Sequence, residues 1–93
     1  MKRLEWNEEK NAFLKIQRGV SFEDVQVAIA EDRLLGVIEH PNKGLYPNQQ
    51  LLIVNIDDYA YLIPFVEDKE KYFLKTIYPS RKLTKKYIIN KKE

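Results

Sequence analysis

Residues 33–78 constrain the fold most, because they form a series of short apolar segments separated by turn-forming residues. The segments are rich in aliphatic, β-branched and aromatic residues, the composition of strands. The links are a loop dense in Pro, Asn and Gly, a tight turn at Asp57-Asp58 and a charged turn over residues 67–70. Strands joined by such links form an antiparallel meander. We predict four antiparallel strands, over residues 34–39, 50–56, 59–66 and 71–78.

Two prolines mark irregularities in this region. Pro64 falls inside the third expected strand and has no N–H for a ladder, which predicts an edge position or a bulge. Pro79 is expected to end the fourth strand, and Ser80 to cap a C-terminal helix. On that helix Leu83 and Tyr87 lie four residues apart and share one face.

The N-terminal third predicts two helices. Asn7 is a favourable N-cap and Gly19 a favourable stop for a first helix that passes through Phe13 and Ile16, with Trp6 and Phe13 expected in the core. The second helix begins at Ser21 with a capping box and a hydrophobic staple. Its defining residues are the box pair Ser21 and Asp24, the staple pair Val20 and Val25, and the apolar face Phe22, Val25 and Ile29.

These elements predict an α+β fold in one domain of residues 1–93, a length that supports one modest core. The expected architecture is an antiparallel four-stranded sheet, with a short extra N-terminal strand over residues 2–6. Two N-terminal helices pack on one face, and a C-terminal helix follows the sheet. Residues 88–93 form a basic tail that is expected to fray.

Composition excludes several classes of function. The chain has no cysteine and one histidine, so it offers no disulfide, thiolate chemistry or His-rich metal site. The acidic pairs at residues 57–58 and 68–70 lack metal-site spacing, so no metal or other cofactor is expected. The N-terminus is too charged for a signal peptide, and no apolar run reaches membrane length, which favours a cytoplasmic protein without a membrane partner.

Charge is distributed unevenly along the chain. Residues 1–80 hold ten Lys and Arg against thirteen Asp and Glu, whereas residues 81–93 hold six Lys and Arg against one Glu. A basic end on a mildly acidic body favours an anionic partner, either nucleic acid or an acidic protein. Arg81 is the strongest candidate for gripping a phosphate, because its guanidinium fork can contact two oxygens. Further candidates for nucleic-acid contact are Lys82, Lys85 and Lys86, with Tyr78 and Tyr87 either stacking on bases or belonging to the core or its rim.

Three other residues are candidates for catalysis. His40 is the only histidine, the residue type whose ordinary pKa lies near neutrality, and it begins the Pro/Asn/Gly-rich loop. Glu67, at the expected end of a strand, is a rival base. Lys75 alternates onto the side of Phe73 and Ile77, so it is either buried with a partner or marks a hydrated functional face of the sheet.

Two segments resemble the BrnT-type toxins of bacterial toxin–antitoxin systems, which are small ribonucleases with the RelE-like fold. The first comprises Trp6-Asn7, Lys10-Asn11 and residues 17–23 (QRGVSFE), and the second is residues 78–87 (YPSRKLTKKY). Arg18 stands where the family has His, and it is included among the expected RNA contacts. The family's Glu-Arg pair is absent from residues 47–50, and Thr76 occupies the position of another family Arg.

The resemblance implies an endoribonuclease toxin that cleaves RNA without a metal and is neutralised by a cognate antitoxin. The antitoxin would be acidic or DNA-binding, and this protein would contact DNA only indirectly, through the antitoxin. Arg81 would lie in the active site, together with the candidates His40, Lys75 and Glu67. The departures from the family keep a second hypothesis open, a non-catalytic module that binds nucleic acid or protein on the same fold. Unrelated enzyme chemistry is a third, since fold does not fix function.

Overall fold

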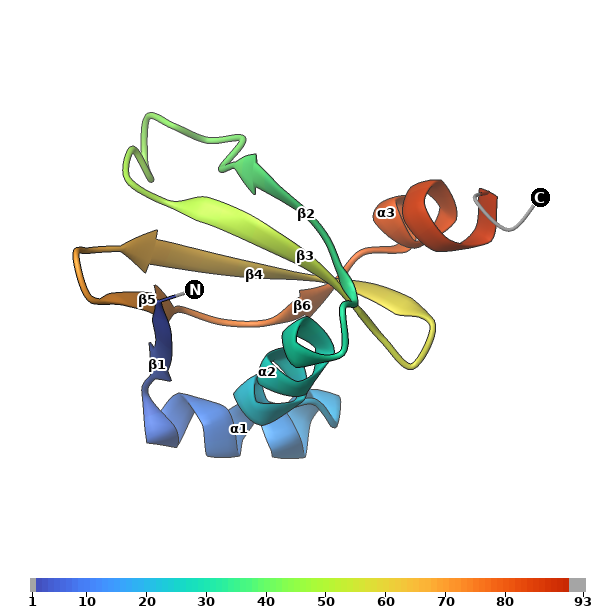
Figure 1. Cartoon of the computed structure of the whole chain (residues 1–93), viewed down its shortest axis with the longest axis horizontal. Helices are drawn as coiled ribbons and strands as arrows, with labels where there is room; N and C mark the ends of the chain where they lie inside the picture. Colours follow the sequence, from blue (N-terminus) through green and yellow to red (C-terminus); the bar gives the residue numbers. More distant parts are fainter. Residues whose placement is uncertain (1, 91–93) are drawn as a thin grey trace.

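One mixed β-sheet organises the chain, and helices lie on both of its faces (Figure 1). The computed structural model describes residues 2–90. The strands are β1 (Arg3–Trp6), β2 (Leu34–Glu39), β3 (Gln50–Ile56), β4 (Tyr59–Glu67), β5 (Lys71–Leu74) and β6 (Tyr78–Pro79). The helices are α1 (Glu8–Arg18), α2 (Phe22–Ala30) and α3 (Arg81–Thr84), which continues as the π-helical segment η1 (Lys85–Ile89).

The sheet differs from the expected one in strand number and direction. Its order is β1-β5-β4-β3-β2, with β6 also paired to β4, which makes six strands where four and a short N-terminal one were expected. The predicted meander is present, since β2, β3, β4 and β5 are antiparallel neighbours. The N-terminal strand β1 runs parallel to β5, from the pair Arg3 and Lys71 to the pair Trp6 and Leu74. The prediction of an extra N-terminal strand is confirmed, and an all-antiparallel sheet is not found.

A break divides the predicted strand over residues 71–78. β4 pairs with β5 through Phe65 to Glu67 and with β6 through Tyr61 and Leu62, and Pro64 lies in the gap between the two pairings. The Pro64 carbonyl accepts a hydrogen bond from the Lys75 N–H at 2.8 Å, so the backbone nitrogen of Pro64 faces the same gap. The missing N–H of Pro64 therefore removes no hydrogen bond between β4 and β3. The edge position predicted for Pro64 is wrong, because β4 is an inner strand, and the irregularity lies in the neighbouring strand instead. Pro79 also belongs to β6, where it pairs with Tyr61.

Helices α1 and α2 pack on one face of the sheet, where Figure 1 shows them together. The predicted caps are confirmed: the Asn7 side chain accepts from the Lys10 N–H, Ser21 and Asp24 form the capping box, and Gly19 ends α1 with φ 68°. Trp6 is half-buried and stacks on Phe22 with ring centroids 5.5 Å apart.

The core position predicted for Phe13 is wrong. Phe13 is 51% exposed and Ile16 is 81% exposed, whereas Leu14 is fully buried. The helix turns Asn11 and Leu14 inward because the Asn11 side chain binds the start of α2: its oxygen accepts from the Phe22 N–H at 2.8 Å, and its amide donates to Glu23 at 2.7 Å. Polar contacts between the helices, rather than apolar spacing alone, set the orientation of α1.

The opposite face of the sheet is covered at one end by α3 and η1. Leu83 and Tyr87 pack together against a cluster formed by Ile53, Ala60 and Ile88, which confirms their shared face. Ile88 is buried, and residues 91–93 of the expected frayed tail lie outside the described residues. Asp57 and Asp58 both have positive φ, as a tight hairpin turn requires. No helix within residues 2–90 is long and apolar enough to cross a membrane.

Candidate RNA-binding site

A hollow of about 470 Å³ brings together three of the predicted site residues, His40, Lys75 and Tyr78. We call it the His40–Lys75 pocket. Its lining is completed by Tyr46, Gln49, Pro64 and Thr76. Tyr78 pairs with Leu62, which packs against the C-terminal helical segment, and Pro64 lies two residues further along β4. Because alternate residues of a strand share a face, the pocket lies on the side of the sheet that carries α3.

The pocket exists because of two local features of the backbone. The first is the break between β5 and β6, which places Lys75 and Thr76 beside Pro64 instead of in a regular ladder. The second is the loop between β2 and β3, which is closed by a hydrogen bond from the His40 N–H to the Gln49 carbonyl at 3.2 Å. Sequence alone placed His40 and Lys75 in separate segments, and only the sheet brings them together.

The ring of His40 has a defined orientation. Its Nδ1 accepts a hydrogen bond from the Asn42 backbone N–H at 3.0 Å, and its ring centroid lies 4.5 Å from that of Tyr46. Since Nδ1 is engaged as an acceptor, the proton of the neutral imidazole is assigned to Nε2. In this geometry His40 presents an N–H donor and has no free lone pair with which to act as a base.

Lys75 is exposed, so it is not buried with a partner. Its ammonium lies 5.1 Å from the centroid of the Phe73 ring, and it forms no ion pair within residues 2–90. A cation held over an aromatic ring beside an open pocket is well placed to contact an anion. Lys75 therefore supplies the positive charge of the pocket.

Two tyrosines provide polar and aromatic surface. Tyr78 is partly buried, and this burial raises the pKa of its hydroxyl, so the group stays protonated and can donate at neutral pH. Tyr46 is 41% exposed and offers a ring on which a base can stack. Gln49 and Thr76 were not among the predicted site residues, because Gln49 was expected in a turn-rich loop and Thr76 inside a regular strand.

Arg81 follows the pocket residue Tyr78 by three positions, so their Cα atoms lie within about 11 Å of each other. The turn between them is fixed by Ser80, whose N–H donates to the Ala60 carbonyl at 3.0 Å and whose hydroxyl accepts from the Leu83 N–H at 3.2 Å. Arg81 is exposed at the first position of α3. With it we define the α3 cation cluster as Arg81, Lys82, Lys85 and Lys86, all of them exposed.

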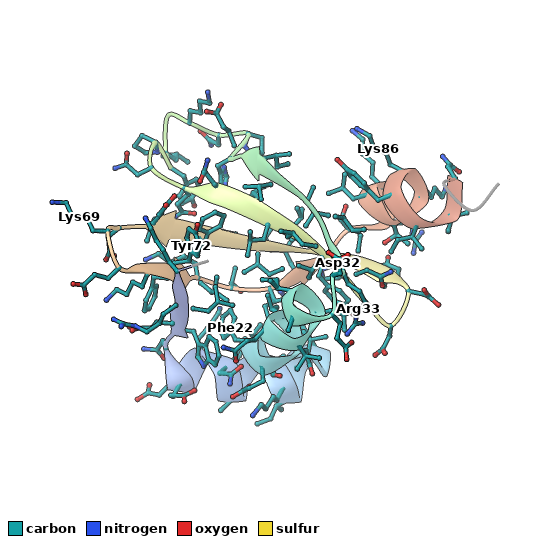
Figure 2. The ribbon with its side chains drawn as sticks, in the orientation of Figure 1. Phe22, Asp32, Arg33, Lys69, Tyr72 and Lys86 are labelled. Carbon is teal, nitrogen blue, oxygen red and sulfur yellow. The ribbon has the colours of Figure 1, made fainter. Side chains whose placement is uncertain are left out.

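The α3 cation cluster forms no ion pair with any described residue. Lys86 instead lies over the ring of Tyr87, with its nitrogen 5.4 Å from the centroid. Figure 2 shows Lys86 on the C-terminal helical segment, away from Phe22 and the α1–α2 pair. Four uncompensated cations near an open pocket attract an anionic partner.

Three other predicted residues lie elsewhere. Glu67 is on the opposite face of the sheet, where it pairs with Lys2 at 2.5 Å. Arg18 donates from its guanidinium to the Ile77 carbonyl, so it holds the segment between β5 and β6 from the side of α1. Tyr87 is half-buried, and its hydroxyl lies beside Gly36 of β2, which makes it chiefly a packing residue.

No three His, Cys, Asp or Glu side chains gather to form a metal site in the described part of the chain. None of the residues that line the His40–Lys75 pocket is a carboxylate. The chemistry available there is therefore hydrogen-bond donation, positive charge and aromatic stacking. Comparison with protein-family models, with curated proteins and with solved structures gives no match for this chain.

Proposed function

We propose that this protein is an endoribonuclease of the BrnT type, a toxin that cleaves RNA without a metal ion. The observation that carries the proposal is the convergence of His40, Lys75 and Tyr78 in one pocket, a few residues from the unpaired Arg81. The antiparallel neighbours β2 to β5, with α1 and α2 on one face and the C-terminal helix on the other, support the α+β part of this proposal, whereas the parallel β1 departs from the antiparallel sheet that was expected.

The chemistry follows from the donors present. The 2′-hydroxyl oxygen attacks the adjacent phosphorus, and the bond from phosphorus to the 5′-oxygen breaks, which leaves a 2′,3′-cyclic phosphate and a 5′-hydroxyl. Lys75 and Arg81 stabilise the negative charge that develops on the phosphoryl oxygens. His40 donates a hydrogen bond from Nε2–H toward the departing oxygen, as a neutral imidazole can. Since no carboxylate lines the pocket, the 2′-hydroxyl proton passes to solvent, and solvent protonates the 5′-oxygen.

A neutralising partner follows from the same charges. The α3 cation cluster attracts carboxylates as readily as phosphates, so an acidic segment of a cognate antitoxin would cover it. DNA would be contacted only through that antitoxin. A toxin of this kind acts in the cytoplasm, where its RNA substrates are found.

The proposal is tested by inducing the wild type and Arg81→Ala in a bacterial host while growth and RNA integrity are followed. We expect growth arrest and RNA loss with the wild type only, at equal amounts of folded protein. Normal growth and intact RNA with the wild type, at confirmed expression, would overturn the toxin function.

The second candidate is a non-catalytic module that binds RNA through the same surface. It is favoured by one observation, the absence of a carboxylate base in the pocket, with Glu67 on the other face of the sheet. Such a module would bind RNA with an affinity that falls steeply with salt, and it would never shorten the RNA. Arg81→Ala would then weaken binding without any change in RNA length.

A further inference from the structure

Strand β2 is an edge of the sheet with open backbone groups. The register of β2 with β3 continues to the pair His40 and Gln49. The His40 N–H donates a hydrogen bond to the Gln49 carbonyl, so this is a hydrogen-bonded pair of the ladder. Hydrogen-bonded pairs alternate along an antiparallel ladder, which turns the N–H and C=O groups of Val37 and Glu39 away from β3. These groups are therefore available to another strand.

The two edges of the sheet are protected differently. β1, the other edge, carries a charged network in which Glu5 pairs with Arg3 at 2.5 Å and with Lys71 at 3.6 Å. Charged side chains are a common protection against unwanted pairing. β2 has no lysine or proline, and its one charged residue is Glu39 at the end of the strand, which pairs with Lys43. Its side chains Val37 and Ile38 are 48% and 39% exposed. An edge whose centre is apolar, with its charge confined to one end, is typical of a strand that pairs with a partner.

An apolar pocket adjoins this edge on the face that carries α2. Its volume is about 130 Å³, and its lining includes Val37 and Leu34 of β2, Ile29 of α2, and Leu52 and Phe65 of the inner strands. That volume is close to the roughly 150 Å³ of an apolar cavity that admits benzene, so one aliphatic side chain fits. A residue of an added strand opposite Val37 would point toward this pocket, because side chains opposite each other share a face.

The other face of β2 lies near positive charge. The hydroxyl of Tyr87 sits beside Gly36, so η1 packs over β2, and Lys86 is the neighbour of Tyr87 on that segment. Lys86 belongs to the α3 cation cluster, and Figure 2 shows it on the C-terminal helical segment. Alternate residues of an added strand would face this cluster, which favours carboxylates at those positions.

We propose that β2 accepts an extended segment of a protein partner as an added strand. In this segment apolar residues, which face the apolar pocket beside α2, alternate with acidic residues, which face the α3 cation cluster. This inference rests on the proposed function in one respect: the partner is taken to be the antitoxin that neutralises the toxin. It specifies where the partner binds and in which conformation. The backbone of β2 provides the affinity, and the pocket and cations select the alternating pattern.

The probe is a fluorescein-labelled nine-residue peptide that alternates Glu with Val or Leu. Its control is a peptide of the same composition with the apolar residues at helical spacing. Binding is followed by fluorescence anisotropy with the wild type, Val37→Pro, Val37→Thr and Lys86→Glu. Proline at position 37 removes an outward N–H and leaves the ladder with β3 in place, whereas threonine keeps the N–H.

We expect saturable binding of the alternating peptide, at least tenfold weaker binding to Val37→Pro than to Val37→Thr, and weaker binding to Lys86→Glu. Hydrogen exchange on the wild type gives a readout that is independent of the proline variant: the peptide should protect the amides of Val37 and Glu39, which are open in the free chain. Absence of saturation, equal binding of the control peptide, or unchanged exchange at these two amides would overturn the inference.

A second copy of the chain is the rival occupant of β2. Sedimentation of the free wild type that shows a dimer, lost in Val37→Pro, would assign the edge to self-association and overturn the proposal. RNA cleavage by the same samples separates the two hypotheses, because Val37 is not part of the His40–Lys75 pocket. Peptide binding without any cleavage would refute the proposed function alone, and cleavage without peptide binding would refute this inference alone.

Discussion

The backbone N–H of Lys75 donates a hydrogen bond to the carbonyl oxygen of Pro64 at 2.8 Å. This bond fixes the chain at the point where β5 has ended and β6 has not begun. A regular strand would continue the ladder past Pro64, but proline offers no N–H to continue it. The pocket at the break, with Lys75 in its wall, is thus a consequence of one proline in the neighbouring strand.

Arg18 should stabilise this break, because its guanidinium satisfies the Ile77 carbonyl that no β4 donor reaches. We expect Arg18→Ala to lower the free energy of unfolding by about 1.5–3 kcal/mol, the range for a hydrogen bond to a charged group. Urea unfolding measures this change. Lys15→Ala is the matched control on α1, since its exposed pair with Glu23 should contribute less than about 0.5 kcal/mol. Equal effects of the two changes would contradict a specific role for Arg18.

Lys75 should act on the bound phosphate and contribute little to folding, since it is exposed and without an ion pair in the described chain. We expect Lys75→Ala to lower the rate of RNA cleavage by at least about tenfold, equivalent to about 1.4 kcal/mol of transition-state stabilisation. Lys71→Ala is the control, because it removes a cation at the start of β5 that pairs with Glu5 and lies outside the pocket. It should leave the cleavage rate within about twofold of the wild-type rate. A similar loss in both variants would show that only overall charge matters.

The orientation of His40 gives an expectation for pH. Because Nδ1 accepts the Asn42 N–H, and no carboxylate lines the pocket, no side chain there is arranged as a general base. The cleavage rate should therefore rise steadily with pH across the neutral range, as hydroxide becomes available. His40→Ala should lower that rate at neutral pH, because it removes the Nε2–H donor. A bell-shaped profile in the wild type would instead reveal a general acid and base acting together.

Glu23 should make the junction of α1 and α2 sensitive to acid. The hydrogen bond from the Asn11 side chain, with further help from the backbone and Lys15, lowers the pKa of Glu23 below its ordinary 4.5. The unfolded chain then binds a proton more readily than the folded one, so this contribution to stability is present above pH 4.5 and is lost as pH falls through the folded pKa.

The corresponding measurement is urea unfolding of the wild type and Glu23→Gln at pH 7 and at about pH 3, below the ordinary Glu pKa. The wild type should be the more stable at pH 7, and the difference should shrink at the acidic pH. An unchanged difference would show that the carboxylate charge plays no part in this junction.

The sequence predicted the elements whose signals are local. Caps at Asn7 and Ser21, the stop at Gly19 and the turn at Asp57-Asp58 depend on neighbours within a few residues, and each is confirmed. The parallel β1 and the divided last strand depend on contacts between distant segments, such as Arg3 with Lys71 and Pro64 with Lys75, which local patterns do not encode.

The candidate site was predictable in part for the same reason. His40, Lys75 and Tyr78 were identified from residue type and position, and the sheet brings them together. Glu67 and Arg18 were equally reasonable by type, but strand alternation puts Glu67 on the other face, and the Ile77 carbonyl engages Arg18. Phe13 was a reasonable core residue by type, yet the polar contacts of Asn11 turn it to solvent.

The most direct test of the central claim is cleavage of a synthetic RNA by purified protein in the presence of EDTA, with products analysed by mass spectrometry. We predict fragments ending in a 2′,3′-cyclic phosphate with the wild type. We also predict at least about a hundredfold slower reaction with Arg81→Ala, the loss typical of removing one donor to developing charge. An RNA with a single 2′-deoxy nucleotide at the cleaved position should remain intact. Intact RNA with the wild type, or equal cleavage by Arg81→Ala, would contradict the assignment of this surface as a ribonuclease site.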